Sequence, residues 1–235
     1  MPLKLLVIIP CYNEQAALPQ LLQAFNEQHL SGYQTELLVV NDSSADDTAA
    51  LAIKHGADLL DLPINLGIGG AVQSGLLYAQ KHHFDLAVQM DGDGQHQPEE
   101  LSKLLNCYQQ TGANLIIGSR FIEHKGYLST FARRLGISWF RYLIKLLTGS
   151  TVYDSTSGFR LFDKKAIAFG ADHYPDEYPE PESLIMFLKA GLSICETPVQ
   201  MAPRNGGRSS IRNFASLYYC IKVTIAMLFS AVRKI

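Results

Sequence analysis

The sequence is poor in the features that mark several common classes of protein. Its 235 residues include four cysteines, and no two of them form a Cys-x-x-Cys pair. Widely spaced cysteines fit reduced thiols in a cytosolic protein better than a disulfide scaffold or a zinc site. Charged residues make up 18% of the chain, the formal net charge is -2, and no Lys/Arg-rich arm is present. Bulk attraction to nucleic acid is therefore not indicated.

Long uninterrupted apolar runs are also missing. Residues 1–10 are apolar, but this run is too short for a signal peptide and leads directly into Cys11-Tyr12-Asn13-Glu14. Residues 213–232 are mostly apolar, yet Lys222 interrupts a run that needs about 20 apolar residues to span a bilayer. The sequence has no internal repeat, low-complexity tract or clear linker. We expect one domain over residues 1–210 and a C-terminal amphipathic helix over 211–235.

Short apolar segments rich in β-branched residues alternate with helix-like segments along most of the chain. This alternation predicts an α/β fold with a mostly parallel central sheet that is flanked by helices. The expected strands span residues 5–9, 36–40, 57–62, 84–90, 114–118, 154–162 and 192–199. The expected helices span 15–28, 46–55, 68–83, 98–110, 127–147, 183–189 and 213–232.

Three loops that follow expected strands are polar or acidic: Asn13-Glu14, Asn41-Asp42-Ser43-Ser44 and Asp91-Gly92-Asp93. Open α/β sheets bind ligands in the crevice beyond the carboxyl ends of their strands, so we expect these loops to share one site. Ser44, Asp46 and Asp47 have an alternative role, as the cap and first turn of a helix. Asp42 at the strand end suits a ribose hydroxyl or a base N–H.

The turn Asp91-Gly92-Asp93-Gly94-Gln95-His96 is the most informative of these loops. Two carboxylates one residue apart repel each other unless a cation or hydrogen-bond donors offset them. A hard divalent cation that also binds phosphate oxygens is their natural partner. Because the pattern is short, a solvated acidic turn is the alternative. His96 is either a metal ligand or a hydrogen-bonded histidine of the turn.

The glycine-rich segment of residues 65–75 invites comparison with dinucleotide-binding loops. A Gly-x-Gly-x-x-Gly pattern that starts at Gly67 needs glycine at position 72, which is Val72. The acidic residue expected about 20 residues later, at the end of a second strand, is also absent. A dinucleotide-dependent oxidoreductase is therefore disfavoured, although the glycines permit close approach of the backbone to a ligand.

Arginines in the later loops suit a ligand with phosphate groups. Arg120 ends a strand, Arg160 follows the turn of residues 154–158, and residues 204–210 form a basic loop. Each is an ordinary surface loop when taken alone, but three of them beside an acidic metal-type site indicate a diphosphate ligand. Glu180 and Glu182 precede a helix, where acidic residues are common, and both are candidate site residues.

Two of the expected helices have the composition of elements that lie at a membrane surface. Residues 213–232 place eight apolar side chains on one side, from Phe214 to Val232, with Lys222 and Ser230 toward the other. A helix in the plane of a membrane and a helix packed on the domain's own core both fit this pattern. Residues 127–147 combine Trp139, Phe140 and Tyr142 with basic residues, which is also typical of an interface.

Taken in order, six motifs resemble those of family 2 glycosyltransferases, and most closely the dolichol/polyprenyl-phosphate sugar transferase branch. The resemblance covers residues 3–210 and implies a GT-A fold, a nucleotide-diphosphate sugar donor and a divalent metal, Mg²⁺ or Mn²⁺. The motifs are residues 7–14, Asn41-Asp42-Ser43-Ser44, Asn65-Leu66-Gly67 with Gly69-Gly70, Asp91-Gly92-Asp93-Gly94-Gln95-His96, Gly118-Ser119-Arg120 and Ser157-Gly158-Phe159-Arg160.

The resemblance assigns donor and metal sites to individual residues. Asp42 matches the acid that contacts the nucleotide, and Asp91 and Asp93 match the metal-binding pair, with Gln95 beside them as a third metal ligand. Asp91 serves the metal or the ribose, whereas Asp93 is the firmer ligand and a catalytic residue. The matched motifs add further donor-binding residues: Pro10, Tyr12, Asn13, Glu14 and Gly67.

The resemblance also assigns residues to the phosphate groups. Arg120 and Arg133 are similar to arginines that meet the acceptor phosphate, and Arg204 resembles one near the donor diphosphate. Glu182 is placed with the catalytic residues. The sequence departs from the family pattern at Asn41, where aspartate is usual, and at Ser43, where glycine is usual, so base contacts are not carried over in detail. The multi-span C-terminal membrane domain of some relatives is absent from residues 1–235.

We expect inverting transfer of a hexose from UDP-glucose or UDP-N-acetylglucosamine to a polyprenyl phosphate, in cell-envelope glycan synthesis. The acceptor phosphate is already anionic, so it needs positioning and no general base. A sugar or protein hydroxyl acceptor is an alternative that requires Glu180 or Glu182 as a base. A sugar-nucleotide-binding subunit without turnover is another.

The expected location is cytoplasmic and peripheral, on the inner face of the cell membrane. Attachment there would rest on the two amphipathic helices or on a partner protein. A second copy of the chain is left open as a further partner, and no nucleic acid is expected.

Overall fold

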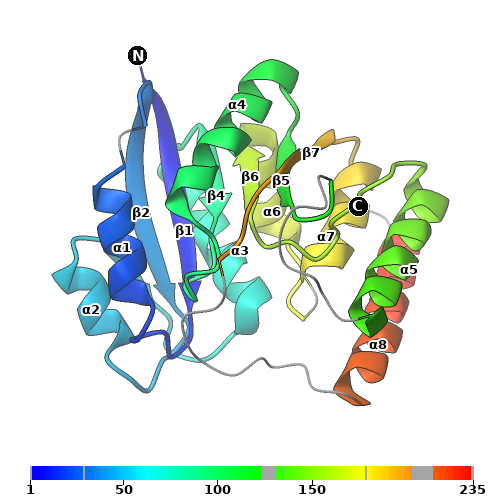
Figure 1. The fold of residues 1–235 in the computed structure, drawn as a ribbon, viewed down its shortest axis with the longest axis horizontal. Coiled ribbons are helices and arrows are strands. Elements are labelled where there is room, and N and C mark those ends of the chain that lie inside the picture. The colour runs from blue at the N-terminus through cyan, green and yellow to red at the C-terminus, as the bar shows by residue number, and fades with distance from the viewer. Residues whose placement is uncertain (1, 29, 123–130, 178, 203–213, 234–235) are drawn as a thin grey trace.

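The computed structural model describes residues 2–28, 30–122, 131–177, 179–202 and 214–233, without the side chains of residues 131–135 and 214–217. Within this part, seven strands form one sheet in the order β3-β2-β1-β4-β6-β5-β7 (Figure 1). Strand β6 is antiparallel to both of its neighbours, and every other pair is parallel. The expected α/β fold with a mostly parallel sheet is confirmed.

The strands are β1 (Leu3–Cys11), β2 (Tyr33–Asn41), β3 (Asp58–Asp61), β4 (Leu86–Gln89), β5 (Leu115–Ser119), β6 (Arg160–Asp163) and β7 (Ile194–Pro198). The helices are α1 (Leu18–Asn26), α2 (Thr48–Lys54), α3 (Gly67–Lys81), α4 (Leu101–Thr111), α5 (Phe131–Thr148), α6 (Lys164–His173), α7 (Pro179–Lys189) and α8 (Phe214–Val232). A short 3-10 turn, Pro98–Glu100, precedes α4.

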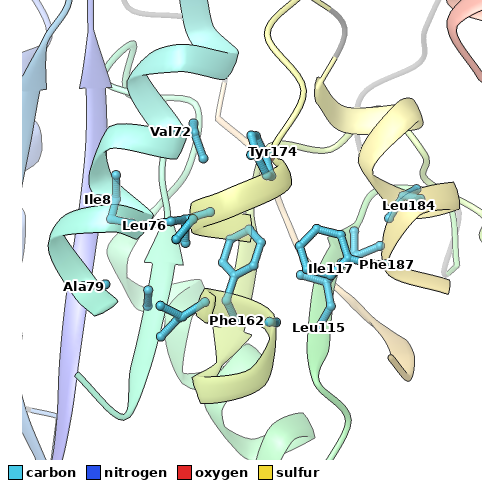
Figure 2. Packing of buried hydrophobic residues seen from close by; sticks show 14 of the residues in the cluster. Ile8, Val72, Leu76, Ala79, Leu115, Ile117, Phe162, Tyr174, Leu184 and Phe187 are labelled. Atoms are coloured by element: carbon cyan, nitrogen blue, oxygen red, sulfur yellow. The ribbon is translucent and has the colours of Figure 1, made fainter. Parts of the chain in front are cut away.

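The central strands are buried on both faces, which explains why they read as continuous apolar runs. Alternate residues of β1 enter two different cores: Leu5 and Val7 pack on the side of α1 and α4, and Leu6 and Ile8 on the side of α3, α6 and α7. Figure 2 shows the second core, in which helix and strand residues interlock: Val72, Leu76, Leu115, Ile117, Phe162, Leu184 and Phe187. Each such side chain stabilises the fold by about 1.5–3 kcal/mol through burial.

Two local predictions were wrong. The expected strand over 154–162 is a loop as far as Phe159, and pairing begins at Arg160. Helix α6 was not expected, although Asp163 gives the usual signal for a helix start: its carboxylate accepts a hydrogen bond from the Ala166 N–H at 2.8 Å. Strand β6 inserts between β4 and β5, and α6 follows it directly.

Helices α5 and α8 lie side by side at the end of the molecule away from β3 (Figure 1). The Trp139 indole N–H of α5 donates to Thr224 Oγ1 of α8 at 2.9 Å. Helix α8 is also joined to α7, because the Lys189 ammonium donates to the backbone carbonyls of Ala231 and Arg233 at 2.5 and 2.8 Å. Cations near the last carbonyls of a helix stabilise its C-terminus.

Helix α8 packs through the side opposite to its apolar stripe. Val223 and Met227 are buried in the core, whereas the apolar stripe faces outward, with relative exposures from 45% to 77%. The outward residues are Tyr218, Ile221, Ile225, Leu228, Phe229 and Val232. One face of this helix thus packs on the core, as one alternative expected, and the placement of the outward stripe at a membrane stays a prediction. In the part of the chain described, none of the helices combines the length and hydropathy that a bilayer span requires.

Candidate active site

The loops after β1 and β2 are joined to each other by hydrogen bonds. The Asn13 N–H donates to Ser44 Oγ at 2.9 Å, and Asn13 Oδ1 accepts from the Ala45 N–H at 2.8 Å. The Glu14 N–H donates to Thr48 Oγ1 at 3.0 Å. Ser44 therefore joins the two loops. It does not cap α2, which was the alternative role that the sequence gave it. Such reciprocal bonds hold the two strand ends in one fixed arrangement.

Asp42 lies directly after β2 and is almost fully buried. Its carboxylate accepts hydrogen bonds from the Leu66 and Gly67 N–H groups at 2.6 and 2.9 Å, and so caps the N-terminus of α3. Gly67 has φ of 77°, a conformation that favours glycine. Gly67, a predicted donor-binding residue, thus uses its N–H to bind Asp42.

The two departures from the family pattern have local explanations. Asn41 Nδ2 donates to Asp61 Oδ1 at 2.7 Å, and Asn41 is buried. An aspartate at position 41 would place a second carboxylate against Asp61. Ser43 has φ of 59°, a left-handed conformation that glycine adopts at no steric cost, which accounts for the usual glycine.

The acidic turn after β4 is folded around its histidine. The Asp91 N–H donates to His96 Nδ1 at 3.0 Å, so the imidazole proton lies on Nε2. Burial lowers the pKa of His96 below its usual value, although Asp91 opposes this shift, and the ring stacks on Phe159. His96 is therefore a neutral, hydrogen-bonded residue of the turn. Asp93 is buried and accepts from the Gln95 N–H at 3.0 Å.

A cavity of about 360 Å³ opens between these loops. It brings together seven of the candidate site residues, Pro10, Tyr12, Glu14, Asp42, Asp91, Asp93 and Glu180, and its lining is completed by Cys11, Ile68, Ala71 and Gly92. The side chain of Tyr12 is 54% exposed, which leaves its ring accessible to a flat ligand. Asn13, Gly67 and Gln95 lie beside the cavity and support the loops that line it.

Asp91 and Asp93 fit a divalent cation that takes its remaining ligands from a bound diphosphate. Within the described residues, no three His, Cys, Asp or Glu side chains gather as a complete metal site. Mg²⁺ usually binds through one or two carboxylates together with substrate phosphates, so two carboxylates beside the cavity are sufficient. Gln95, next to Asp93 along the turn, is half-buried and stays a predicted third ligand.

Arg120 follows β5 and is bound by an aspartate. Its guanidinium donates from Nε and Nη2 to both oxygens of Asp154, at 2.7 Å each, and from Nη2 to Thr156 Oγ1 at 2.9 Å. Burial lowers the pKa of Arg120, but its bonds with Asp154 raise it above the usual value, so the charge is kept. Three of five N–H donors are thus used. Arg133 lies in the first turn of α5, where side chains are not described, and Arg204 lies outside the described residues.

The two glutamates at the start of α7 point to different places. Glu180 lines the cavity with Asp91, whereas Glu182 accepts a hydrogen bond from Ser230 Oγ of α8 at 2.6 Å. Residues two positions apart on a helix lie about 200° apart around its axis, so Glu180 and Glu182 cannot both face the cavity. The structure therefore does not bring Glu182, predicted to be catalytic, into this cavity. Burial raises the pKa of Glu180, Arg160 opposes the rise, and Asp91 adds to it.

Beneath the cavity, buried polar side chains take roles that the sequence did not reveal. Arg160 was predicted to meet phosphate, but it is fully buried and donates to the Ser157 and Glu180 carbonyls. Gln89 is also fully buried: it accepts from the Tyr174 hydroxyl at 3.2 Å and donates to Asp91 Oδ1 at 3.5 Å. The signal in the sequence for this buried polar contact was a glutamine, Gln89, at the end of an apolar strand.

Comparison with known proteins agrees with this geometry. The chain is 34% identical over 216 residues to the polyprenol monophosphomannose synthase of Mycolicibacterium smegmatis, which covers 88% of this chain and 80% of the relative. It is 27% identical over 221 residues to the UDP-N-acetylglucosamine–dolichyl-phosphate N-acetylglucosaminyltransferase of Methanococcus voltae, with 83% and 84% covered.

Among solved structures, the fold is similar to that of glucosyl-3-phosphoglycerate synthase from Mycobacterium tuberculosis in complex with Mn²⁺, UDP-glucose and phosphoglyceric acid. The TM-score is 0.73 at 18% sequence identity, with 99% of this chain and 81% of that chain covered. The profile described as Glycosyl transferase family 2 matches residues 6–169. The chain therefore belongs to glycosyl transferase family 2, in the branch of polyprenyl- and dolichyl-phosphate sugar transferases, and it is a glycosyltransferase.

Proposed function

We propose that this glycosyltransferase moves a hexose from a UDP-sugar to a polyprenyl phosphate with inversion of configuration. The observation that carries the proposal is the order of polar groups across the sheet. Asp42 follows β2, Tyr12 follows β1, Asp91 and Asp93 follow β4, and Arg120 follows β5. This order matches a nucleoside, a metal-bound diphosphate and an acceptor phosphate placed along one edge.

The carboxylates of Asp91 and Asp93 would hold Mg²⁺ or Mn²⁺, which supplies charge neutralisation for the leaving diphosphate. Tyr12 offers its exposed ring to the base, and Asp42 lies buried at the same end of the cavity. UDP is supported by names of related proteins: one relative uses UDP-N-acetylglucosamine, and a structure of the same fold holds UDP-glucose with Mn²⁺.

Arg120 would position the acceptor phosphate, because its charge is kept and its Nη1 group is not used by Asp154 or Thr156. Arg133 and Arg204 complete the proposed phosphate contacts. An anionic phosphate attacks the anomeric carbon without losing a proton, so no general base is needed. The relatives named for polyprenol and dolichyl phosphate support this acceptor class.

A lipid acceptor requires that the site reach a membrane surface. We propose that the outward stripe of α8, with Trp139, Tyr142 and Leu146 of α5, lies in the interface of the cytoplasmic leaflet. The two helices adjoin through the Trp139–Thr224 hydrogen bond, and Arg141 and Lys145 are exposed on α5. Such basic residues favour an anionic lipid surface.

The test of the proposed reaction is Asp93→Ala, assayed by Mn²⁺-dependent release of UDP with a polyprenyl phosphate acceptor. We expect a loss of more than about hundredfold, because the metal loses its buried ligand. Asp47→Ala is the matched control: this aspartate is exposed, lies outside the cavity, and should leave turnover unchanged. Turnover of Asp93→Ala near the wild-type level would overturn the proposal.

A thermal-shift panel of UDP-, GDP- and other nucleotide sugars with Mg²⁺ or Mn²⁺ identifies the donor, since a specific ligand stabilises the native state. Retained donor binding without release of UDP in the presence of native membranes would instead identify a binding subunit. A hydroxyl acceptor requires a general base, so turnover would then be lost when Glu180 or Glu182 is replaced by glutamine.

A further inference from the structure

The backbone that carries Glu180 is held in place by a buried arginine. Arg160 of β6 donates from Nη2 to the Glu180 carbonyl at 2.7 Å and from Nη1 to Ser183 Oγ at 2.8 Å. Its Nε donates to the Ser157 carbonyl at 2.8 Å, so one fully buried guanidinium joins the loop before β6 to the first turn of α7. Pro179 and Pro181 on either side of Glu180 further restrict the backbone. Glu180 is therefore presented to the cavity from a rigid support.

The order of the strands determines which part of a bound nucleotide sugar lies opposite Glu180. Along the sheet edge, Asp42 of the β2 end and Tyr12 of the β1 end come first, and Asp91 and Asp93 of the β4 end follow. Glu180 is held by β6, the next strand beyond β4. If the nucleoside lies at the β2 end and the diphosphate at Asp93, the group beyond the diphosphate is the sugar.

Glu180 is also separate from the metal-binding pair. It is the cavity's carboxylate on the β6 side, and no group of three acidic, histidine or cysteine side chains within metal-binding reach occurs among the described residues. A carboxylate that is not gathered into a metal site is well suited to accept hydrogen bonds from sugar hydroxyls, which charged acceptors bind more strongly than neutral ones do.

We propose that Glu180 accepts hydrogen bonds from hydroxyl groups of the donor hexose and so helps to select the sugar. This role rests on the proposed function, because it requires a nucleotide sugar in the cavity. A site that binds a hydroxyl through a fixed, half-buried carboxylate discriminates strongly against sugars that lack this hydroxyl or orient it differently. Arg160 is the positioning residue for this contact.

The chain supplies a matched control in Glu182. It is the same residue type on the same turn of α7, but its carboxylate binds Ser230 of α8 on the far side of the helix. A general effect of removing negative charge from the N-terminus of α7 would appear in both variants. An effect through the cavity would appear in Glu180→Gln alone.

The experiment measures binding by titration calorimetry with Mn²⁺ and without acceptor, for the UDP-hexose that the wild type prefers and for UDP. We expect Glu180→Gln to weaken binding of the UDP-hexose by roughly tenfold or more and to change UDP binding by less than about twofold. Glu182→Gln should change neither. An equal loss for UDP and UDP-hexose, or no loss for either, would overturn the proposed sugar contact.

The same titration separates this inference from the proposed function. If the wild type binds UDP with Mn²⁺ but no UDP-hexose, the proposed donor is wrong. The comparison of nucleotide sugar with free nucleotide is then repeated for whichever donor the thermal-shift panel identifies. Glu180 is a sugar contact only if its substitution weakens the sugar-bearing ligand selectively.

Discussion

The two ends of the active-site edge are built by different means. At the end formed by β2, β1 and β4, polar side chains bind backbone amides of neighbouring loops, as in the Asn13–Ser44 and Asp42–Gly67 bonds. At the end formed by β6 and β5, arginines do this work: Arg120 binds Asp154, and the buried Arg160 holds the start of α7.

The difference follows from topology. Parallel βα units bring successive strand ends to one edge, so short polar loops can bond directly to their neighbours. The antiparallel β6 interrupts this pattern, and the elements around it come from distant parts of the chain. Long guanidinium groups bridge the larger gaps between them. The first end is thus held by side-chain bonds to backbone amides, and the second by guanidinium groups that each bind more than one partner.

The largest expected effect concerns the outward stripe of α8. Replacing Ile225 and Phe229 by serine should weaken binding to anionic phospholipid vesicles by roughly hundredfold, or about 3 kcal/mol, because two exposed apolar side chains are removed. Vesicle flotation measures the bound fraction. The control is Ile53→Ser on α2, where the side chain is 62% exposed at the other end of the molecule. Equal loss in both variants would contradict the proposed membrane face.

An effect of similar size is expected from breaking one strong bond at the second end. Asp154→Ala leaves the Arg120 guanidinium, whose side chain is 16% exposed, without its carboxylate. We expect the free energy of unfolding to fall by about 3 kcal/mol. Urea denaturation measures this change, and the double variant Arg120→Met with Asp154→Leu should recover part of it. If the single and double variants lose the same stability, the pair is not what holds this end.

The smallest effect is expected at the first end, where Asn41→Asp restores the usual family residue. The new carboxylate replaces an amide donor that lies 2.7 Å from Asp61 Oδ1, so we expect a loss of about 2 kcal/mol at pH 7. Repulsion raises the pKa of the pair in the folded state, so the loss is full above that pKa and shrinks as the pH falls through it. Denaturation at pH 7 and at about pH 4 tests the sign. Adding Asp61→Asn should restore stability at both.

The parallel half of the fold could be predicted from the sequence because its signals are local. An apolar run followed by a polar turn specifies both a strand and the edge at which the turn lies, and Asp42, Asp91 and Asp93 do line one cavity. The partners of buried polar groups could not be predicted, since Arg160 and Arg120 have the same local signal and only one is exposed to the site's edge. Choosing between Glu180 and Glu182 needed the start of α7, which was expected at residue 183 and lies at Pro179.

The stripe of α8 shows the same limit. Helical spacing indicates which apolar residues share a face, but not what covers that face. The helix is held through Val223, Met227 and Ser230 on its other side, so the more apolar side is the one left outward.

Helix α7 connects the cavity to α8. Its first turn is held at the donor cavity by Arg160, and its last residue, Lys189, is bonded to the end of α8. Eleven residues of α-helix measure about 16 Å, and a helix of this length does not stretch. Its first turn also contacts α8, because Glu182 accepts a hydrogen bond from Ser230, so α7 is joined to α8 near both of its ends. Under the proposed membrane attachment, the cavity and the outward stripe of α8 move together, and an acceptor phosphate meets the site at a fixed position relative to the lipid surface.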